Sequence, residues 1–414
     1  MQWSPQQDEA LTKVDRWLKN PQDKQLFRLF GYAGTGKTTL ARHLAEGVDG
    51  TVLFAAFTGK ATSVLRSHGV FAQTIHSLIY HPKPRSAERL KELIAEQEGI
   101  QQMYYESRRE NPPDWPGNPD WDKRLQQLKG EIQKEKENAS RPDFSLNMES
   151  PLRDAALLVV DECSMVDETM ATNLMSFGVP ILVLGDPAQL PPVKGSGYFT
   201  NAEPDMLLTE IHRQARDNPI IELATLVRNG KVLPLGNYGA SRVIERASPE
   251  MAQDADQVLV GRNRTRLSTN KRMRQLLGFT ADLPQDGEKL VCLRNDNELG
   301  LLNGTLHRQR GDADLFEPWV HLRLTPDENP AAEPLMVRAH PEHFCGNPDD
   351  IGYWTRREAQ EFTFGYALTV HKAQGSQWDK VLIINEADAF NGHTAKRWLY
   401  TAITRAAEEV TIVG

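Results

Sequence analysis

Short apolar runs alternate with segments of helical spacing in the first part of the chain. Residues 1–25 predict a leading helix with Ser4 as its N-cap. Mainly apolar, β-prone runs lie at residues 26–30, 51–57, 155–160 and 181–184, and the run at 155–160 is continuous. Such runs are typical of strands that a parallel sheet buries on both faces. Because helical segments follow them, the pattern predicts an α/β fold with helices covering a parallel sheet.

A second pattern of the same kind occupies the later part of the chain. Helices are predicted at residues 219–228, at 262–277, from about Val370, and at 396–403. Strands are predicted at residues 257–260, 381–384 and 410–413. The chain therefore predicts two α/β regions, each built around its own sheet.

Two segments break these patterns. Residues 81–148 contain two charged helical stretches bounded by prolines, which predicts an inserted helical arm. Residues 285–361 contain short alternating runs separated by Gly, Pro, Asn and Asp, as in a small β-barrel. The predicted domains are 1–80 with 149–207, the arm 81–148, 208–284 with 362–414, and the barrel 285–361.

Composition narrows the class of protein only slightly. The 414 residues are 39% hydrophobic and 25% charged, as in an ordinary globular protein, and the net charge is −8. Three cysteines without C-x-x-C spacing favour a reducing compartment over a disulfide framework or a zinc site. The sequence shows neither an export signal nor a run of about 18 apolar residues. We therefore expect a cytoplasmic protein.

The glycine-rich stretch GYAGTGKT at residues 31–38 lies between a predicted strand and a predicted helix. It fits G-x-x-x-x-G-K-[ST], whose backbone N–H groups surround a triphosphate. Lys37 would reach the β- and γ-phosphates, and the Thr38 hydroxyl would ligate Mg²⁺. The expected cofactors are therefore ATP and Mg²⁺. The expected nucleotide contacts in this loop are Gly34, Thr35, Gly36, Lys37, Thr38 and Thr39.

Catalytic candidates follow other predicted strands. Asp161 is assigned to the metal and Glu162 to the proton of the attacking water. Gln189 could orient that water or sense the γ-phosphate; the alternative is an ordinary loop amide. Arg213 and Arg405 are candidate finger arginines from the second α/β region, unless they form only structural ion pairs.

Six motifs occur in a characteristic order: GYAGTGKT, VVDECSM, LGDPAQLPPV, LTEIHRQ, LTVHKAQGSQWDKV and YTAITRA. In this set the chain closely resembles superfamily-1B DNA helicases of the RecD-like and phage Dda-like branch. The resemblance implies two RecA-like motor domains that translocate 5′ to 3′ on single-stranded DNA. It also implies that the arm is a strand-separating pin and that the barrel is SH3-like.

Family roles carry over at matching motif positions. Gln7 resembles the adenine-reading glutamine, and Gly375 would let backbone approach the phosphates. The implied DNA contacts are Phe57, Thr58, Lys60, Thr74 and His76 on the first motor domain, and Thr369, His371, Lys372 and Gln374 on the second. The alternative is that the hydroxyls and amides only cap helices.

Two positions depart from the family. Phe57 stands where it usually has proline, and could stack on a base or pack in the core. Gln377 stands where glutamate is common, so a ribose contact is not carried over to it.

Aromatic and basic residues outside the motifs leave alternatives open. Tyr104, Tyr105, Trp115 and Trp121 of the arm could form a wedge, or could pack between its own helices. The basic segment 262–274 could line the DNA or nucleotide path, or form a solvated helix face.

The working hypothesis is a monomeric ATP-dependent 5′-to-3′ helicase acting on single-stranded and forked duplex DNA. A single-stranded-DNA-binding or replication protein is its candidate partner. The alternatives are a single-strand translocase that unwinds little, an RNA helicase, and a nucleotide-gated scaffold that binds nucleic acid. A pure switch needs no residues with the roles assigned to Glu162, Gln189 and the two arginines, which argues against the scaffold.

Overall fold

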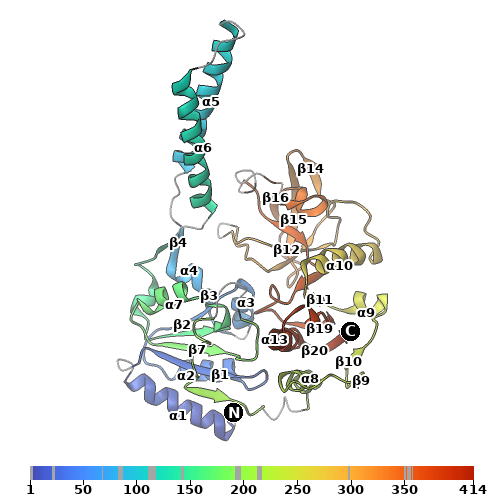
Figure 1. The fold of residues 1–414 in the computed structure, drawn as a ribbon. Helices are drawn as coiled ribbons and strands as arrows, with labels where there is room; N and C mark the ends of the chain where they lie inside the picture. The colour runs from blue at the N-terminus through green and yellow to red at the C-terminus, as the bar shows by residue number, and fades with distance from the viewer. Residues whose placement is uncertain are drawn as a thin grey trace. The chain divides into compact units, whose positions relative to one another are not determined.

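Six parallel strands form the first sheet of the computed structural model (Figure 1). The structure describes residues 3–20, 24–67, 69–82, 87–110, 118–140, 144–191, 197–211, 217–296, 299–348, 351, 356 and 358–414. In spatial order the strands are β3 (Ala72–Thr74), β2 (Val52–Ala56), β6 (Leu157–Asp161), β7 (Ile181–Gly185), β1 (Leu26–Gly31) and β8 (Met206–Leu208). Every strand pair in this sheet is parallel. The carboxyl ends of β1, β6 and β7 therefore meet at one edge.

Helices around the first sheet follow the predicted pattern. They are α1 (Pro5–Lys19), α2 (Lys37–Glu46), α3 (Gly59–Ser67), α4 (Ile75–Ile79) and α7 (Glu168–Met175), with short 3₁₀ turns at Pro151–Asp154 and Cys163–Met165. Ser4 caps α1 in a capping box with Gln7. The apolar face of α1 buries Ala10, Val14 and Trp17. This burial fixes α1 against the sheet, next to the loop after β1.

The second sheet is also mainly parallel. Its spatial order is β18 (Ala367–Thr369), β11 (Gln257–Val260), β19 (Trp378–Ile384), β20 (Ala406–Val413), β10 (Ser241–Ile244) and β9 (Gly236–Tyr238). Only the edge pair β9 and β10 is antiparallel. Its helices are α8 (Pro219–Arg228), α9 (Pro249–Asp254), α10 (Asn263–Leu276) and α13 (Gly392–Ile403), with a 3₁₀ turn at Ala387–Ala389. The predicted α/β fold is thus confirmed in both regions.

An antiparallel sheet is inserted between β11 and β18 in the chain. Its strands are β12 (Lys289–Cys292), β13 (Leu306–Gln309), β14 (Asp314–Phe316), β15 (Trp319–Pro326), β16 (Leu335–Ala339) and β17 (Phe362–Phe364). The short helix α11 (Glu342–Cys345) lies between β16 and β17 in the chain. Leu290, Val320 and Phe362 belong to its apolar core. Its closure into an SH3-like barrel stays a prediction.

Residues 80–147 form a separate compact unit. It contains β4 (Tyr80–Pro82), α5 (Ala87–Glu110), α6 (Pro119–Ser140) and β5 (Phe144–Leu146), and β4 pairs with β5. Arg124 of α6 forms ion pairs with Glu96 of α5 and Glu131 of its own helix. The unit is therefore a pair of long helices joined to the chain through two short strands.

Three predictions about elements and boundaries are wrong. No helix begins at Val370 in the described structure: residues 370–375 form turns, because Gly375 adopts φ +76° after a single turn. Phe362–Phe364 belongs to the inserted sheet, where it pairs with β12, and not to the region 362–414. Leu208 ends β8 of the first sheet, so that sheet extends one residue past the predicted boundary at 207.

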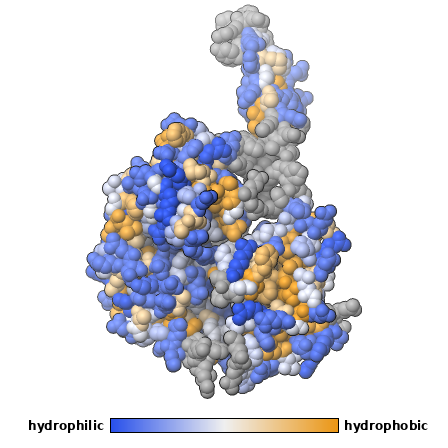
Figure 2. Space-filling view, turned by 180° about the vertical axis from the view of Figure 1, so that it is seen from behind, coloured by the Kyte–Doolittle hydropathy of each residue, from blue (hydrophilic) through white to orange (hydrophobic). Residues whose placement is uncertain are grey.

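One face of the described surface is mainly hydrophilic. Figure 2, which views the side opposite to Figure 1, shows hydrophilic residues over most of the coloured surface and apolar residues in scattered patches. Among the helices that the structure describes, none has both the length and the apolar character needed to cross a membrane.

Candidate functional site

The loop between β1 and α2 has the geometry of a phosphate-binding loop. Gly34 and Gly36 adopt φ +76° and +78°, values that side-chain-bearing residues rarely reach. Lys37 opens α2, and its Nζ donates to the carbonyl oxygens of Gly31 at 2.6 Å and Tyr32 at 3.1 Å. The loop, the N-terminus of α2 and the lysine together form a concave positive site, which suits a polyphosphate.

Gln7, on α1, hydrogen bonds to this loop. Its Nε2 donates to the Thr35 carbonyl oxygen at 3.0 Å, and its Oε1 accepts from the Ser4 N–H at 3.0 Å. The Gln7 side chain is buried, and a Cβ at Gly36 would lie 2.9 Å from its Nε2. The structure therefore places Gln7 as a brace for the loop. Its contact with adenine stays a prediction.

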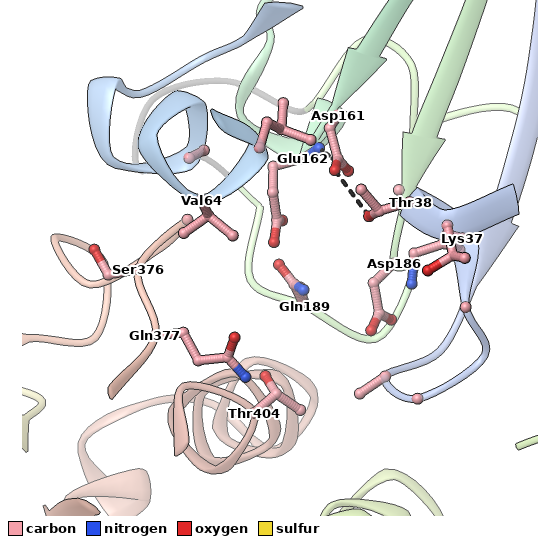
Figure 3. Close-up of a pocket in the computed structure, with 18 of the residues that line it drawn as sticks. Lys37, Thr38, Val64, Asp161, Glu162, Asp186, Gln189, Ser376, Gln377 and Thr404 are labelled. Atoms are coloured by element: carbon pink, nitrogen blue, oxygen red, sulfur yellow. Dashed lines mark hydrogen bonds between the residues drawn. The ribbon is translucent and has the colours of Figure 1, made fainter. Parts of the chain in front are cut away.

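Two side chains predicted to ligate a metal lie beside the loop. Thr38 Oγ1 donates to Asp161 Oδ2 at 3.0 Å, shown as a dashed line in Figure 3. Burial and the neighbouring Glu162 carboxylate raise the pKa of Asp161 to about 6. A hydroxyl beside a carboxylate is the hard oxygen donor set that Mg²⁺ prefers, so these residues fit the expected metal.

Glu162 has a strained backbone. Its φ of 51° is the only positive value of a non-glycine residue within the described ranges. Such a conformation costs on the order of 1–3 kcal/mol and is concentrated at functional sites. In Figure 3 its carboxylate points towards Gln189, in the interior of the pocket.

Arg405 reaches this carboxylate from the second sheet. Its Nη1 lies 3.8 Å from Glu162 Oε1. With the Gln189 amide in the orientation that satisfies both of its ends, Gln189 Nε2 donates to Glu162 Oε2 at 2.9 Å and its Oε1 accepts from Arg405 at 3.3 Å. Arg405 is buried and also donates to the carbonyl oxygens of Ser376 and Thr401. The three predicted polar residues therefore form one connected group.

One pocket of about 440 Å³ is lined by the phosphate loop together with Asp161, Glu162, Gln189 and Arg405. Its walls come from both sheets: the phosphate loop and the ends of β6 and β7 on one side, and residues Gly375–Gln377 and Thr404–Arg405 on the other. Thr39 lines it, as does Arg42, which the motif analysis did not single out. Arg213 lies outside the described residues, so its predicted role has no structural description here.

Two further residues at this junction were missed from the sequence. Asp186, after β7, and Tyr400, on α13, are hydrogen bonded to each other at 2.7 Å. Both lie inside quoted motifs, LGDPAQLPPV and YTAITRA, which is the signal that could have identified them.

The predicted DNA contacts of the first sheet are mainly helix-terminal residues. Thr58 Oγ1 accepts from the Ala61 N–H at 3.1 Å, and Thr74 Oγ1 accepts from the Ser77 N–H at 3.2 Å. The capping alternative therefore describes both threonines. Phe57 packs edge-on against His76, with ring centroids 5.9 Å apart, and burial lowers the pKa of His76.

Lys60 is engaged by the inserted sheet. Its Nζ forms an ion pair with Glu328, which follows β15, and burial lowers the pKa of Lys60. Next to it, a Cβ at Gly59 would overlap Leu302 of the inserted segment. The inserted sheet thus contacts the motif in which a DNA-binding lysine is predicted.

The predicted contacts of the second sheet differ in exposure. Thr369 and Gln374 are buried, and Gln374 Nε2 donates to the Leu190 carbonyl oxygen at 2.8 Å. His371 lies partly exposed near Phe390, and Lys372 is exposed. A Cβ at Gly375 would lie 2.7 Å from Thr58 Oγ1, so this glycine allows the motif loops of the two sheets to approach closely.

The arm aromatics are only partly described. The Tyr104 and Trp121 rings lie 5.8 Å apart, and the Tyr104 hydroxyl hydrogen bonds to Asp122. These two residues pack within the helical unit. Trp115 and the Tyr105 side chain lie outside the described part of the chain. Of the basic segment, Arg274 is paired with Glu288 and Arg262 with Glu386.

Comparison with known proteins agrees with the family that the motifs indicate. Residues 2–248 match the family model described as AAA domain, and residues 364–413 match the UvrD-like helicase C-terminal domain. The ATP-dependent RecD2 DNA helicase of Deinococcus radiodurans is 29% identical over 286 residues, which cover 62% of this chain and 36% of that protein. The chain spans between 36% and 50% of the length of the curated relatives it matches.

Solved structures of Pif1 helicases share the fold. A structure of Pif1 helicases at forked double-stranded DNA has a TM-score of 0.52 at 17% identity, and Bacteroides Pif1 bound to single-stranded DNA has 0.51 at 16% identity. Each comparison covers 99% of this chain and 92% of the other. Because the matched AAA domain model spans residues 2–248, more than half of the chain, the chain belongs to the AAA domain family, and it is similar in sequence to helicases of the RecD type.

Proposed function

We propose that this protein is an ATP-dependent DNA helicase that moves 5′ to 3′ along single-stranded DNA and opens forked duplexes. The observation that carries the proposal is Arg405, which extends from the second sheet to Glu162 and Gln189 in the pocket of the first. An arginine supplied by a second domain makes hydrolysis depend on the approach of that domain.

The residues of the pocket divide the chemistry among them. The phosphate loop and Lys37 would hold the triphosphate, and Thr38 and Asp161 would hold Mg²⁺. When bound, the nucleotide and metal supply the scissile phosphoryl group and neutralise part of its charge. Glu162 Oε2 accepts a proton from a water that Gln189 orients, and Arg405 stabilises the developing negative charge.

The placement of these residues supports the proposed movement along DNA. Glu162 and Gln189 extend from the first sheet, whereas Arg405 and Gly375 extend from the second. Closing the pocket therefore brings together the motif loops that hold Thr58 and Gly375, and opening it separates them. Alternate gripping by the two motif sets would carry a single strand in one direction.

Steady-state ATP hydrolysis with and without single-stranded DNA or RNA tests the proposal. Lys37→Ala should lose about a hundredfold or more of the DNA-stimulated rate, whereas exposed Lys231→Ala should retain it. Forks with a 5′ tail should be unwound and forks with a 3′ tail should not. Wild-type turnover that no nucleic acid stimulates would favour the scaffold instead, and stronger stimulation by RNA would favour an RNA helicase.

A translocase with little unwinding is the second candidate. The observation in its favour is the packing of Tyr104 against Trp121 and Asp122 inside the helical unit, which occupies two proposed wedge residues. Displacement of a protein block from single-stranded DNA, without strand separation on any fork, would identify this activity.

A further inference from the structure

One hydroxyl group joins the second sheet to the phosphate loop. Tyr400, on α13, is buried, and its Oη accepts from the backbone N–H of Ala33 at 2.9 Å. The same Oη donates to Asp186 Oδ2 at 2.7 Å. Ala33 lies within the phosphate loop and Asp186 follows β7, so a single side chain of α13 bonds two separate segments of the first sheet.

The charges at this junction keep the two bonds in their observed direction. Asp186 is buried, and its Oδ1 accepts from the Ala188 N–H at 2.9 Å. Burial and the Asp186 carboxylate raise the pKa of Tyr400, so the phenol keeps its proton and remains a donor. The hydroxyl therefore uses its proton on Asp186 and a lone pair on Ala33.

The same helix carries the arginine that reaches the pocket. Thr401 Oγ1, one residue after Tyr400, accepts from the Leu190 N–H at 2.9 Å. Arg405 lies four residues beyond Thr401, and its Nε donates to the Thr401 carbonyl oxygen at 3.2 Å. The contacts of Tyr400 and Thr401 with the loops of the first sheet thus determine the position of the Arg405 guanidinium.

We propose that Tyr400 is a positioning residue, whose hydroxyl fixes α13 to the phosphate loop so that Arg405 reaches Glu162 and Gln189. The inference rests on the proposed function, because it assigns Arg405 a role in ATP hydrolysis. Tyr400 acts through Arg405, because the Tyr400 hydroxyl already forms hydrogen bonds with Ala33 and Asp186. Tyr400 therefore affects the rate of ATP hydrolysis more than the affinity for nucleotide.

Tyr400→Phe removes both hydrogen bonds while keeping the ring. The kcat for DNA-stimulated ATP hydrolysis should fall about tenfold, because the lost bonds include one to a carboxylate. The KM for ATP and the affinity for a fluorescent ADP analogue should stay within about twofold. Tyr238→Phe is the matched control, since its hydroxyl donates to the Pro234 carbonyl oxygen of the same domain at 2.9 Å. An unchanged kcat for Tyr400→Phe would overturn the inference.

A double-mutant cycle separates positioning from general stability. In an Arg405→Gln background, Tyr400→Phe should cause no further loss of kcat, because the group that it positions is gone. An equal tenfold loss in both backgrounds overturns the inference but leaves the proposed function intact. If Arg405→Gln itself retains the wild-type kcat, the role proposed for Arg405 fails instead.

Thermal unfolding is followed for each variant. If Tyr400→Phe does not fold, Asp186→Asn replaces it in the cycle. The asparagine keeps one oxygen, which can accept from Tyr400, but removes the charge and the second acceptor, which serves the Ala188 N–H. A smaller loss of about threefold is expected. A loss for Asp186→Asn that is the same with and without Arg405→Gln would likewise count against positioning.

Discussion

The nucleotide pocket and the predicted DNA motifs use their polar side chains differently. In the pocket, Lys37, Asp161 and Glu162 project from strand ends and loops into one shared space. In the motifs, Thr58 and Thr74 cap short helices, and Lys60 pairs with Glu328. A pocket that must act on one bond requires convergent side chains. A track that must slide along a backbone can rely on helix ends and exchangeable ion pairs.

This difference also affects how a substitution should act. Under the proposed function, removing a polar side chain from the pocket removes a catalytic group and leaves the surrounding sheet in place. Removing one from the motifs alters a cap or an ion pair that also shapes the fold. We therefore expect large effects on rate in the first region and smaller effects on stability or affinity in the second.

The largest effect is expected for Glu162→Gln. The amide is nearly isosteric but cannot accept the proton of the attacking water, so kcat should fall roughly 10² to 10⁴-fold. Nucleotide affinity should be retained because Lys37 and the loop are untouched. Steady-state ATP hydrolysis and titration with a fluorescent ADP analogue measure the two quantities. Exposed Glu203→Gln is the control, and a kcat within threefold of wild type would refute the assigned role of Glu162.

The next largest effect is a loss of stability at low pH in the inserted sheet, which contacts the predicted DNA motif around Lys60. Burial lowers the pKa of His307 to about 4, below the value of about 6.5 expected in the unfolded chain. The unfolded state therefore binds more protons between these values, so stability is full above pH 6.5 and falls as the pH decreases towards 4. The loss from this histidine should reach about 2 kcal/mol between pH 7 and pH 5.

Urea unfolding at pH 7 and pH 5, followed by a probe on the inserted sheet, measures this loss. His307→Asn should reduce the difference in unfolding free energy between the two pH values, whereas substitution of the exposed His393 should not. Equal pH dependence in wild type and His307→Asn would show that this histidine is not the group responsible.

The sequence predicted many of the polar residues that line the pocket, because the motifs that hold them are local in the chain. The spacing of Gly36, Lys37 and Thr38 specifies a loop geometry, and two apolar runs place Asp161 and Gln189 at the same sheet edge. Most central strands and helices of both α/β regions followed from the same periodicity, whereas the spatial order of the strands was not predicted. Arg405 was identified through its motif, although its contact with Glu162 depends on how two sheets meet.

The remaining features depend on contacts between distant segments. The motif around Tyr400 gave no sign that its hydroxyl would bond Ala33, 367 residues away. Phe362–Phe364 has the same apolar character as a strand of either sheet, so only pairing with β12 assigns it. The sequence after Thr369 predicted a helix, but Gly375 has a left-handed backbone conformation that ends the chain's single turn there.

The smallest effect is expected at Lys60, the point where the inserted sheet meets the DNA motif. If Lys60 contacts a phosphate, Lys60→Ala should weaken single-stranded DNA binding about 3- to 10-fold and reduce the salt dependence of log Kd by about one. Glu328→Gln removes the competing carboxylate and should strengthen binding slightly, which a purely structural ion pair would not do. Fluorescence anisotropy across a series of salt concentrations measures both, with Lys231→Ala as the control. Weaker binding in Glu328→Gln as well as in Lys60→Ala would mean that the ion pair supports the fold of this motif. The proposed difference between the pocket and the predicted DNA motifs would then not apply to Lys60.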